Sequence, residues 1–182
     1  MNLVHPIKDL NTVAQFKAKL KEKNYRDYMV FTMGINVGLR ISDLLPLRVE
    51  QLLDKQYLEI VEEKTNKPKR FLINSQIQNE IKMYVEALGL EPSDYMFNSR
   101  FKGKHLSRIQ CWRVLEATAK ELGIEGFGTH SLRKTFGYHH FKRNKDLAML
   151  QKIFNHSSQS VTLAYIGLTD EEIDKTIEDF FI

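Results

Sequence analysis

Apolar residues recur every three to four positions along most of this chain, and polar residues fill the positions between them. That spacing predicts amphipathic helices that bury one face. The first helix begins near Asp9 or Asn11, either of which can cap its N-terminus, and it carries lysines opposite its apolar face. That apolar face consists of Leu10, Val13, Phe16 and Leu20.

The same periodicity predicts that the chain is mostly helical. A second helix over 25–38 is more apolar than the first, and Met29, Val30, Met33 and Val37 face inward on it. The other predicted helices span 42–45 before Pro46, 75–88 before Gly89, 107–122 before Gly123, 131–143, 146–154, 158–165 and 170–181.

One segment has a different period. Residues 57–62 and 70–74 have the pattern of two short strands, and 64–68 between them are rich in turn residues. A β-hairpin is therefore predicted here. The expected fold class is mainly α with a small β-hairpin (α+β).

Length and composition restrict the class of protein. The 182 residues are 42% hydrophobic and 27% charged, which suits one core, so we expect a single domain over 1–182. No run of about 18 apolar residues and no secretory signal occurs. Cys111 is the only cysteine, which excludes a disulfide scaffold and a thiolate-rich metal site. These features predict a soluble cytoplasmic protein.

Charge is distributed unevenly, although the formal net charge is only +4. Residues 98–145 hold eleven Lys and Arg against three Glu, a net of +8, whereas 166–182 hold six acids and one lysine, a net of −5. A basic body with an acidic end suits a protein that binds a polyanion with one face. Two solvated surfaces are the simpler explanation when charge is taken alone.

Six side chains are candidates for chemistry: Arg40, Lys64, His130, Arg133, His156 and Tyr165. Each has an ordinary explanation by itself. Arg40 follows a helix end, where a cation meets the C-terminal dipole favourably, and a lysine in a turn is usually solvated. A tyrosine at a helix end is usually part of the core.

Their arrangement resembles a known family, the tyrosine recombinases of the phage-integrase and Xer type. Segment 37–47 (VGLRISDLLPL) resembles the first box of the family, 129–136 (THSLRKTF) its His-x-x-Arg box, and 154–166 (FNHSSQSVTLAYI) the segment with the last histidine and the nucleophilic tyrosine. The hairpin lysine follows the first arginine by 24 residues, the last histidine follows the second arginine by 23, and the tyrosine comes nine later. The resemblance covers essentially the whole chain.

The resemblance implies the catalytic domain of a site-specific recombinase or integrase, which breaks and rejoins DNA strands. Arg40 and Arg133 would present paired donors to phosphate oxygens, and His156 would add a third. Their charge would replace the divalent ions of nucleases, so no metal is expected. No nucleotide cofactor is expected either, because the covalent ester would conserve the bond energy. Tyr165 would attack phosphorus and form a 3′-phosphotyrosyl bond, which a hydroxyl from another strand would then reverse.

Three further roles follow from the resemblance. Lys64 would protonate the departing 5′ oxygen, because a mobile hairpin tip suits a group that approaches only in the assembled complex. His130 would accept the proton of the tyrosine or contact the phosphate, and both roles stay open. Asp43, three residues after Arg40, would orient that arginine, or else be an ordinary surface carboxylate.

The chain departs from the family pattern in places. Asn155 stands where the family most often has glycine, and Gly167 where a second histidine often follows the tyrosine; we expect both changes to be tolerated. We expect the N-terminal core-binding domain of the family to be missing from this chain, either because the chain is an excised catalytic domain or because it is a naturally short member. This expectation predicts weak, salt-sensitive DNA binding and low activity alone. The adjacent histidines 139–140 lack companion ligands at metal-binding spacing.

Double-stranded DNA and further copies of the chain are the expected partners. We expect a monomer in isolation and a tetrameric synapse on DNA in the full system, in the bacterial cytoplasm. An apolar stripe in the acidic end packs on its own core, which is favoured for an isolated domain, or on a neighbouring protomer. The stripe consists of Ile173, Ile177, Phe180 and Phe181.

Two other functions are compatible with such a site. A topoisomerase that forms 3′-phosphotyrosine would relax supercoils with the same groups. A DNA-binding regulator would retain the site without cleaving. The intact set of six residues favours an enzyme, because a protein that only binds DNA has no need of Tyr165.

Overall fold

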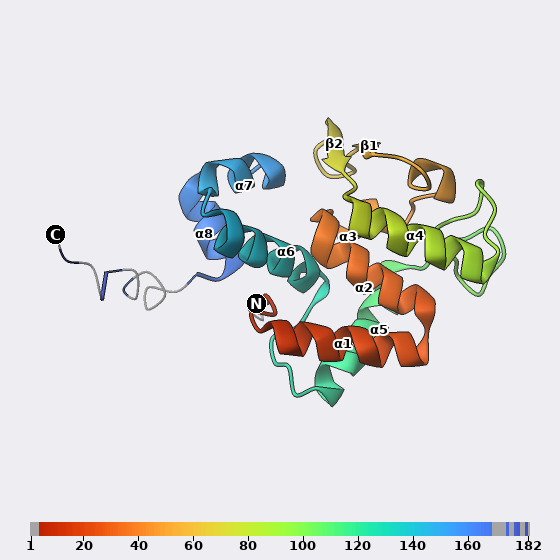
Figure 1. Ribbon diagram of the computed structural model, residues 1–182, viewed down its shortest axis with the longest axis horizontal. Helices are drawn as coiled ribbons and strands as arrows, with labels where there is room; N and C mark the ends of the chain where they lie inside the picture. The colour runs from red at the N-terminus through yellow and green to blue at the C-terminus, as the bar shows by residue number, and fades with distance from the viewer. Residues whose placement is uncertain (1–3, 169–173, 175–176, 179–180, 182) are drawn as a thin grey trace.

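The computed structural model describes residues 4–168, 174, 177–178 and 181. Its described part contains eight α-helices, one short 3₁₀ turn and a two-stranded antiparallel sheet, which confirms the predicted class (Figure 1). The elements are α1 Leu10–Lys23, α2 Tyr25–Val37, α3 Ile41–Leu44, η1 Val49–Gln51, β1 Tyr57–Val61, β2 Pro68–Leu72, α4 Ser75–Leu88, α5 Arg108–Glu121, α6 Thr129–Asn144, α7 Leu147–Phe154 and α8 Gln159–Ile166.

Capping decides where the first helix begins. The carboxylate of Asp9 accepts hydrogen bonds from the backbone N–H groups of Asn11 and Thr12, so Asp9 rather than Asn11 is the cap. Leu10 is 68% exposed, so its predicted place on the buried face of α1 is wrong. It is the first residue of the helix, and the buried face starts one turn later at Val13.

The second strand of the hairpin begins two residues before its predicted start. β2 spans Pro68–Leu72 instead of 70–74, and Pro68 pairs with Val61. Proline is tolerated at the first position of a strand, because no ladder hydrogen bond is required from it there. Lys64 consequently lies within the short turn that joins the strands.

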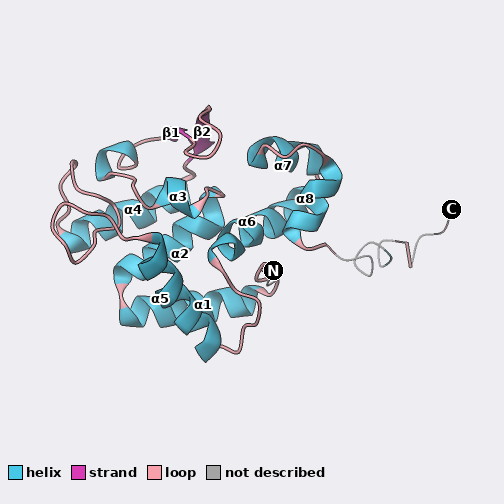
Figure 2. Cartoon of the chain, turned by 180° about the vertical axis from the view of Figure 1, so that it is seen from behind, coloured by secondary structure: helices cyan, strands magenta, loops and turns pink. Residues whose placement is uncertain are grey.

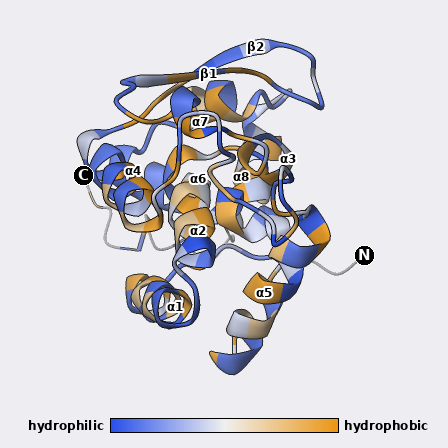
Figure 3. Cartoon of the chain, turned by 90° about the vertical axis from the view of Figure 1, so that its right-hand side faces the viewer, coloured by the Kyte–Doolittle hydropathy of each residue, from blue (hydrophilic) through white to orange (hydrophobic). Residues whose placement is uncertain are grey.

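Helix α2 is the centre of the larger of two hydrophobic cores. It packs against α1, α4, α5 and α6, and nine of its thirteen residues are buried. This position explains why its sequence is more apolar than that of α1. Figure 3 shows the hydrophobic colour concentrated on the helices around α2, while β2 is largely hydrophilic.

A smaller core lies at the other end of the molecule, where α6, α7 and α8 come together (Figure 2). Its buried residues are Tyr138, Leu150, Phe154 and Ile166. Helix α6 joins the two cores, since Leu132 on the same helix belongs to the larger one. At Gly137 of α6, an added Cβ would lie 2.7 Å from both Phe154 and Ile166, so glycine permits this close packing.

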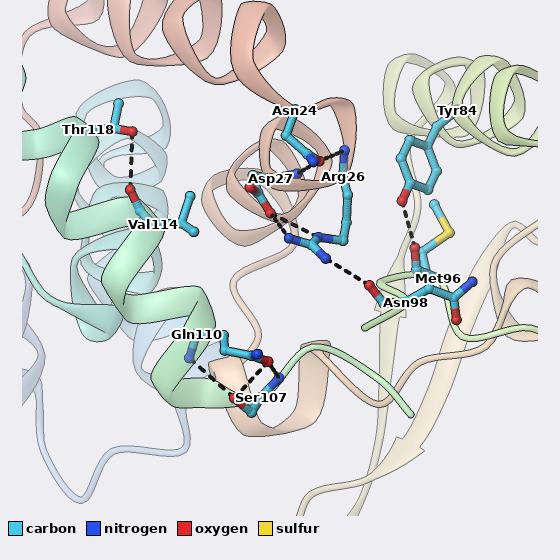
Figure 4. Close-up of polar contacts among 10 residues, drawn as sticks. All are labelled: Asn24, Arg26, Asp27, Tyr84, Met96, Asn98, Ser107, Gln110, Val114 and Thr118. Carbon is cyan, nitrogen blue, oxygen red and sulfur yellow. Dashed lines mark hydrogen bonds and ion pairs between the residues drawn. The ribbon is translucent and has the colours of Figure 1, made fainter. Parts of the chain in front are cut away.

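Figure 4 shows polar contacts within α2, within α5, and between α2 and the segment around Asn98. Arg26 donates two hydrogen bonds to Asp27, of 2.9 and 2.8 Å, and one of 2.9 Å to the carbonyl of Asn98. The thiol of Cys111 on α5 is buried, and this burial raises its pKa to about 12.

The predicted helix over 170–181 lies outside the described residues, apart from 174, 177–178 and 181. Ile177 and Phe181 are 61% and 97% exposed. The expectation that the apolar stripe packs on its own core is therefore wrong for these two residues. The small core is formed without them. Within the described ranges, every helix is too short or too polar to traverse a bilayer.

Candidate active site

Arg40 lies where α2 ends and α3 begins. Gly38 ends α2 in the left-handed conformation, with φ of 72°, and an added Cβ there would lie 2.6 Å from the ring of Phe136. This close approach holds the start of α3 against α6. The side chain of Arg40 is 17% exposed, and its Nη1 donates to Oε1 of Glu62 over 2.7 Å.

Asp43 makes a different contact from the one expected. Its Oδ1 accepts a 2.9 Å hydrogen bond from the backbone N–H of Glu63, and its buried Oδ2 has no partner. The direct partner of Arg40 is therefore Glu62, and the expectation that Asp43 orients this arginine by contact is corrected. Asp43 instead connects the hairpin turn to α3, because its carboxylate accepts the backbone N–H of Glu63.

Arg133 lies on α6 between the two cores and is 3% exposed. Its Nη2 donates to the carbonyl of Phe154 over 3.1 Å, and its guanidinium carbon is 4.7 Å from the centre of the Phe154 ring. Its Nη1 is buried and has no hydrogen-bond partner. A buried donor without a partner is costly, so this N–H group is suited to bind an anion that enters the site.

Tyr165 lies near the end of α8, half-buried beside both Phe154 and His156. The ring centroids are 5.2 and 4.9 Å away, in edge-on geometry. Burial raises the pKa of the Tyr165 hydroxyl, and the positive charges of Arg133 and Arg40 oppose that rise. The hydroxyl is thus protonated at neutral pH, and both arginines lie close enough to stabilise a phenolate.

A buried threonine fixes the tautomer of His156. Oγ1 of Thr162 is 3.1 Å from Nδ1 of His156 and 3.1 Å from the carbonyl oxygen of Ser158. Because the hydroxyl gives its one hydrogen to that carbonyl, it accepts from His156, and Nδ1 carries the ring proton. Burial and the charge of Arg133 lower the pKa of His156. The ring is therefore neutral at pH 7, with an unprotonated Nε2.

A cavity of about 580 Å³ brings Arg40 together with Lys64 and His130, and Arg108 of α5 forms part of its wall. Lys64 is exposed in the hairpin turn. His130 keeps more than a third of its surface exposed, yet burial of its ring and the nearby positive charge of Arg133 lower its pKa. Both groups are therefore accessible to a ligand.

The six predicted residues thus lie in one region of the molecule. Arg40 lines the cavity with the hairpin lysine and the first histidine, and its charge also acts on Tyr165 and His156 of the small core. Arg40 is paired with Glu62, and the charges of both arginines lower the pKa of Glu62 and oppose the rise that burial causes in the pKa of Tyr165. The catalytic role of each residue stays a prediction.

Three residues of this region were not identified from the sequence: Glu62, Lys69 and Thr162. The sequence did indicate Glu62: Leu58 and Ile60 of β1 point inward, and Glu62, the residue after the strand, continues this alternation. A charge at an inward position needs a partner. Nothing in the sequence indicated Lys69, because its partner Ile153 is distant in the chain. Nothing indicated Thr162 either, because its contacts depend on the local geometry of α8.

Asn155 and Gly167 are the two departures from the family pattern, and each ends a helix in the left-handed conformation. Asn155 ends α7 with φ of 57°, and Gly167 ends α8 with φ of 70°. Asparagine is one of the few residues that adopt this left-handed conformation routinely. It therefore takes the place of glycine at the end of α7.

The adjacent histidines on α6 form no metal centre within the described residues. His139 Nε2 is 2.9 Å from the carbonyl oxygen of Ile7, so this ring contacts the N-terminal segment. No group of three or more potential ligands among the described residues could hold a metal ion.

Comparison with known proteins identifies the family. The sequence profile of the phage integrase family matches residues 7–172. The chain belongs to the phage integrase family. A probable integrase/recombinase, YoeC of Bacillus subtilis (strain 168), is 44% identical over 171 residues, which cover 94% of this chain and 93% of that protein. A tyrosine recombinase of Pseudothermotoga lettingae is 30% identical over 152 residues, 82% of this chain and 52% of that protein.

Solved recombinase structures share the fold of this integrase-family chain. A XerA recombinase matches with a TM-score of 0.78 and 18% identity over 97% of this chain and 63% of its own. A XerH site-specific recombinase bound to difH matches with a TM-score of 0.79 and 16% identity, over 98% and 53%. At these identities the likeness shows the fold alone, and it confirms the expected recombinase-like architecture.

The family assignment confirms the prediction of a tyrosine recombinase. Neither the topoisomerase nor the non-cleaving regulator is favoured by the relatives, which are named integrases and recombinases. The chain spans nearly all of YoeC and about half the length of the longer recombinases that it matches.

Proposed function

We propose that this integrase-family chain is the catalytic domain of a recombinase that cleaves and rejoins double-stranded DNA through Tyr165. The observation that carries the proposal is the placement of Arg133 beside Tyr165: its guanidinium carbon lies 4.7 Å from the centre of the Phe154 ring, and the Tyr165 ring lies 5.2 Å from the same ring. The charges of Arg133 and Arg40 also oppose the rise that burial causes in the pKa of the Tyr165 hydroxyl. The unpartnered, buried Nη1 of Arg133 supports an anionic ligand at this point. A phosphodiester beside a phenol matches that environment.

In the first step, the Tyr165 oxygen forms a bond to phosphorus while the bond from phosphorus to the 5′ oxygen breaks. The phenol proton passes to a nearby base, and Lys64 supplies a proton to the departing 5′ oxygen. The products are a 3′-phosphotyrosyl ester and a free 5′-hydroxyl. In the second step, a 5′-hydroxyl from another strand attacks the ester and restores the phenol.

The two arginines would stabilise the negative charge that develops on the phosphate oxygens. Loss of one such electrostatic contact typically costs about 10²–10³ in rate. Because the ester conserves the energy of the broken bond, the proposed reaction needs no nucleotide cofactor.

Two histidines are available for the proton of Tyr165. His130 lies at the mouth of the cavity, and His156 is in ring contact with the tyrosine. With its proton on Nδ1, His156 presents Nε2 as an acceptor. After it gains a second proton, the same atom would donate to a phosphate oxygen.

Double-stranded DNA is the proposed partner. Segment 98–145, with its net charge of +8, includes all of α5 and α6, which contribute Arg108 and His130 to the cavity. Structural neighbours include a XerH recombinase bound to difH and a Tn1549 transposon integrase in complex with transposon right end DNA. We propose a monomer in isolation and a tetrameric synapse on DNA, as expected from the sequence.

Covalent trapping on DNA tests the function. The purified chain is incubated with nicked duplexes that contain a randomised segment, and protein-linked DNA is recovered after denaturation in detergent and sequenced. We expect one enriched site with the chain joined to 3′ phosphate ends, and no adduct for Tyr165→Phe. DNA binding without any adduct would contradict cleavage and support the regulator. An adduct that survives Tyr165→Phe would exclude Tyr165 as the nucleophile.

A further inference from the structure

Glu62 is an acidic residue at the base of the hairpin turn, and only 1% of it is exposed. Its Oε1 accepts from Arg40 at 2.7 Å and lies 3.5 Å from Nζ of Lys69, while Oε2 accepts from the Thr65 hydroxyl at 2.9 Å. Burial disfavours the anion, but the Thr65 hydrogen bond and the charges of Lys69, Arg40 and Arg133 lower the pKa of Glu62. Glu62 is therefore a compensated anion.

Three parts of the site meet at this carboxylate. Arg40 reaches it from the start of α3. Lys69 reaches it from β2, and Nζ of Lys69 also donates to the carbonyl of Ile153 at the end of α7. Two backbone hydrogen bonds of Glu62, 3.0 and 2.8 Å long, close the turn that carries Lys64.

The ion pair leaves Arg40 free to bind a phosphate. A guanidinium has five N–H donors, and Glu62 engages Nη1 alone. Without an anion at this point, three cations would lie close together in a poorly solvated place. The carboxylate therefore allows Arg40, Arg133 and Lys69 to be assembled before DNA arrives.

We propose that Glu62 is a positioning residue for strand cleavage: it holds the guanidinium of Arg40 and, with Lys69, fixes the hairpin to α7, so that Arg40 and Lys64 approach the same phosphodiester. The inference rests on the proposed function, because it concerns the geometry of that reaction. It assigns Glu62 no contact with the DNA.

Two modified linkages separate the two effects of Glu62. A 5′-bridging phosphorothiolate has a leaving group that needs no proton, so it relieves the requirement for Lys64. A methylphosphonate lacks one negative charge, so it relieves the requirement for a guanidinium. Single-turnover formation of the covalent adduct is measured on the selected site with a normal phosphate, a phosphorothiolate or a methylphosphonate.

Glu62→Gln keeps the shape of the side chain and removes its charge. We expect cleavage of the normal linkage to fall about 10- to 100-fold, since a hydrogen bond to a charged group is weakened. Because both Arg40 and Lys64 would be misplaced in Glu62→Gln, its loss of cleavage rate relative to wild type should be smaller on each modified linkage than on the normal phosphate. Lys64→Ala should recover on the phosphorothiolate alone, and Arg40→Ala on the methylphosphonate alone. Glu59→Gln, on the exposed side of β1, is the matched control and should behave as wild type.

A deficit of equal size on all three linkages would overturn the inference, because it would show general damage to the fold. Wild-type rates for Glu62→Gln would overturn it as well. If the wild-type chain forms no adduct on any linkage, the proposed function fails. If wild type, Lys64→Ala and Arg40→Ala behave as stated and Glu62→Gln does not, the inference alone fails.

Lys69→Met provides a second route to the same test if Glu62→Gln does not fold. It removes the link from the hairpin to α7 and leaves the ion pair of Glu62 with Arg40. We expect partial recovery on the phosphorothiolate and none on the methylphosphonate. Full recovery of Lys69→Met on the phosphorothiolate, with none for Lys64→Ala, would make Lys69 the proton donor and overturn the arrangement.

Discussion

The two hydrophobic cores of this molecule differ greatly in size, and the proposed catalytic groups are divided between them. The larger core contains thirty buried residues, and its elements carry Arg40, the hairpin and the N-terminal half of α6. The smaller core has four buried residues; α8 carries Tyr165, and the loop between α7 and α8 carries His156. The proposed phosphate-binding groups are thus mounted on the part with more buried contacts, whereas the proposed nucleophile belongs to the part with fewer, which we expect to open more easily.

Arg133 has the largest predicted effect, because it connects the two regions. Its Nη2 donates a hydrogen bond to the carbonyl of the last residue of α7, and its buried Nη1 has no hydrogen-bond partner. Arg133→Ala should reduce the single-turnover rate of adduct formation by about 10²–10³ or more. Arg133→Lys should be nearly as severe, since an ammonium lacks the planar pair of donors.

Arg26→Lys is the control for Arg133. Arg26 is also a partly buried arginine, but it pairs with Asp27 on α2, away from the cavity. Its rate should equal that of wild type. A rate for Arg133→Lys close to wild type would contradict a bidentate contact with phosphate.

Phe154→Ala should break the smaller region selectively. Truncation of a buried phenylalanine costs about 3–5 kcal/mol, and Phe154 contacts Arg133, His156 and Tyr165. We expect amide hydrogen exchange to rise in α7 and α8, with α1 to α5 still protected, and cleavage to be lost.

Phe16→Ala in the larger core is the comparison for Phe154→Ala. Phe16 stacks on Phe31 with ring centroids 4.3 Å apart. Its truncation should lower the melting temperature of the whole chain and raise exchange throughout. If both variants raise exchange uniformly, the two cores unfold as one unit and the proposed difference is wrong.

Thr162→Val should have a moderate effect, confined to His156. Valine has nearly the same shape but cannot accept the Nδ1–H hydrogen bond. One such bond is worth about 1 kcal/mol, so cleavage should fall about 5- to 10-fold. Thr162→Ser keeps the hydroxyl and should retain most activity. Nitrogen-15 spectra of the histidine ring would report a change of tautomer in Thr162→Val alone.

Acid sensitivity of the fold is the smallest expected effect. The pKa values of His130 and His156 are lowered, chiefly by burial. A lowered histidine pKa stabilises the fold above the unfolded value, near 6.5, and this contribution is lost as pH falls through the folded value. The free energy of unfolding in urea should therefore decrease between about pH 7.5 and about pH 5.5, above the range of ordinary carboxylates.

Single substitutions would locate this acid sensitivity in one region. His156→Gln removes the histidine beside the small core, and His130→Gln removes the one at the start of α6. Each variant should make the free energy of unfolding depend less steeply on pH. A slope unchanged by both variants would mean that neither histidine is linked to folding.

Most elements of the fold could be predicted from the sequence, because the apolar residues of each helix recur with the helical period of three to four residues. The second strand was misplaced because a proline normally argues against a strand, and only pairing with Val61 gives Pro68 its place. The six candidate residues came from boxes that resemble a family. Glu62 and Thr162 escaped detection because their importance depends on Arg40 and His156, which fold against them.

The buried thiol on α5 has a practical consequence. Cys111 is the single cysteine of the chain, and burial raises its pKa to about 12. Maleimides at neutral pH would not react with Cys111, because its thiol is buried and almost entirely protonated. A cysteine introduced at Asn66, in the exposed hairpin turn, would take up a fluorophore at that point alone. Its emission would then follow the hairpin as it approaches DNA.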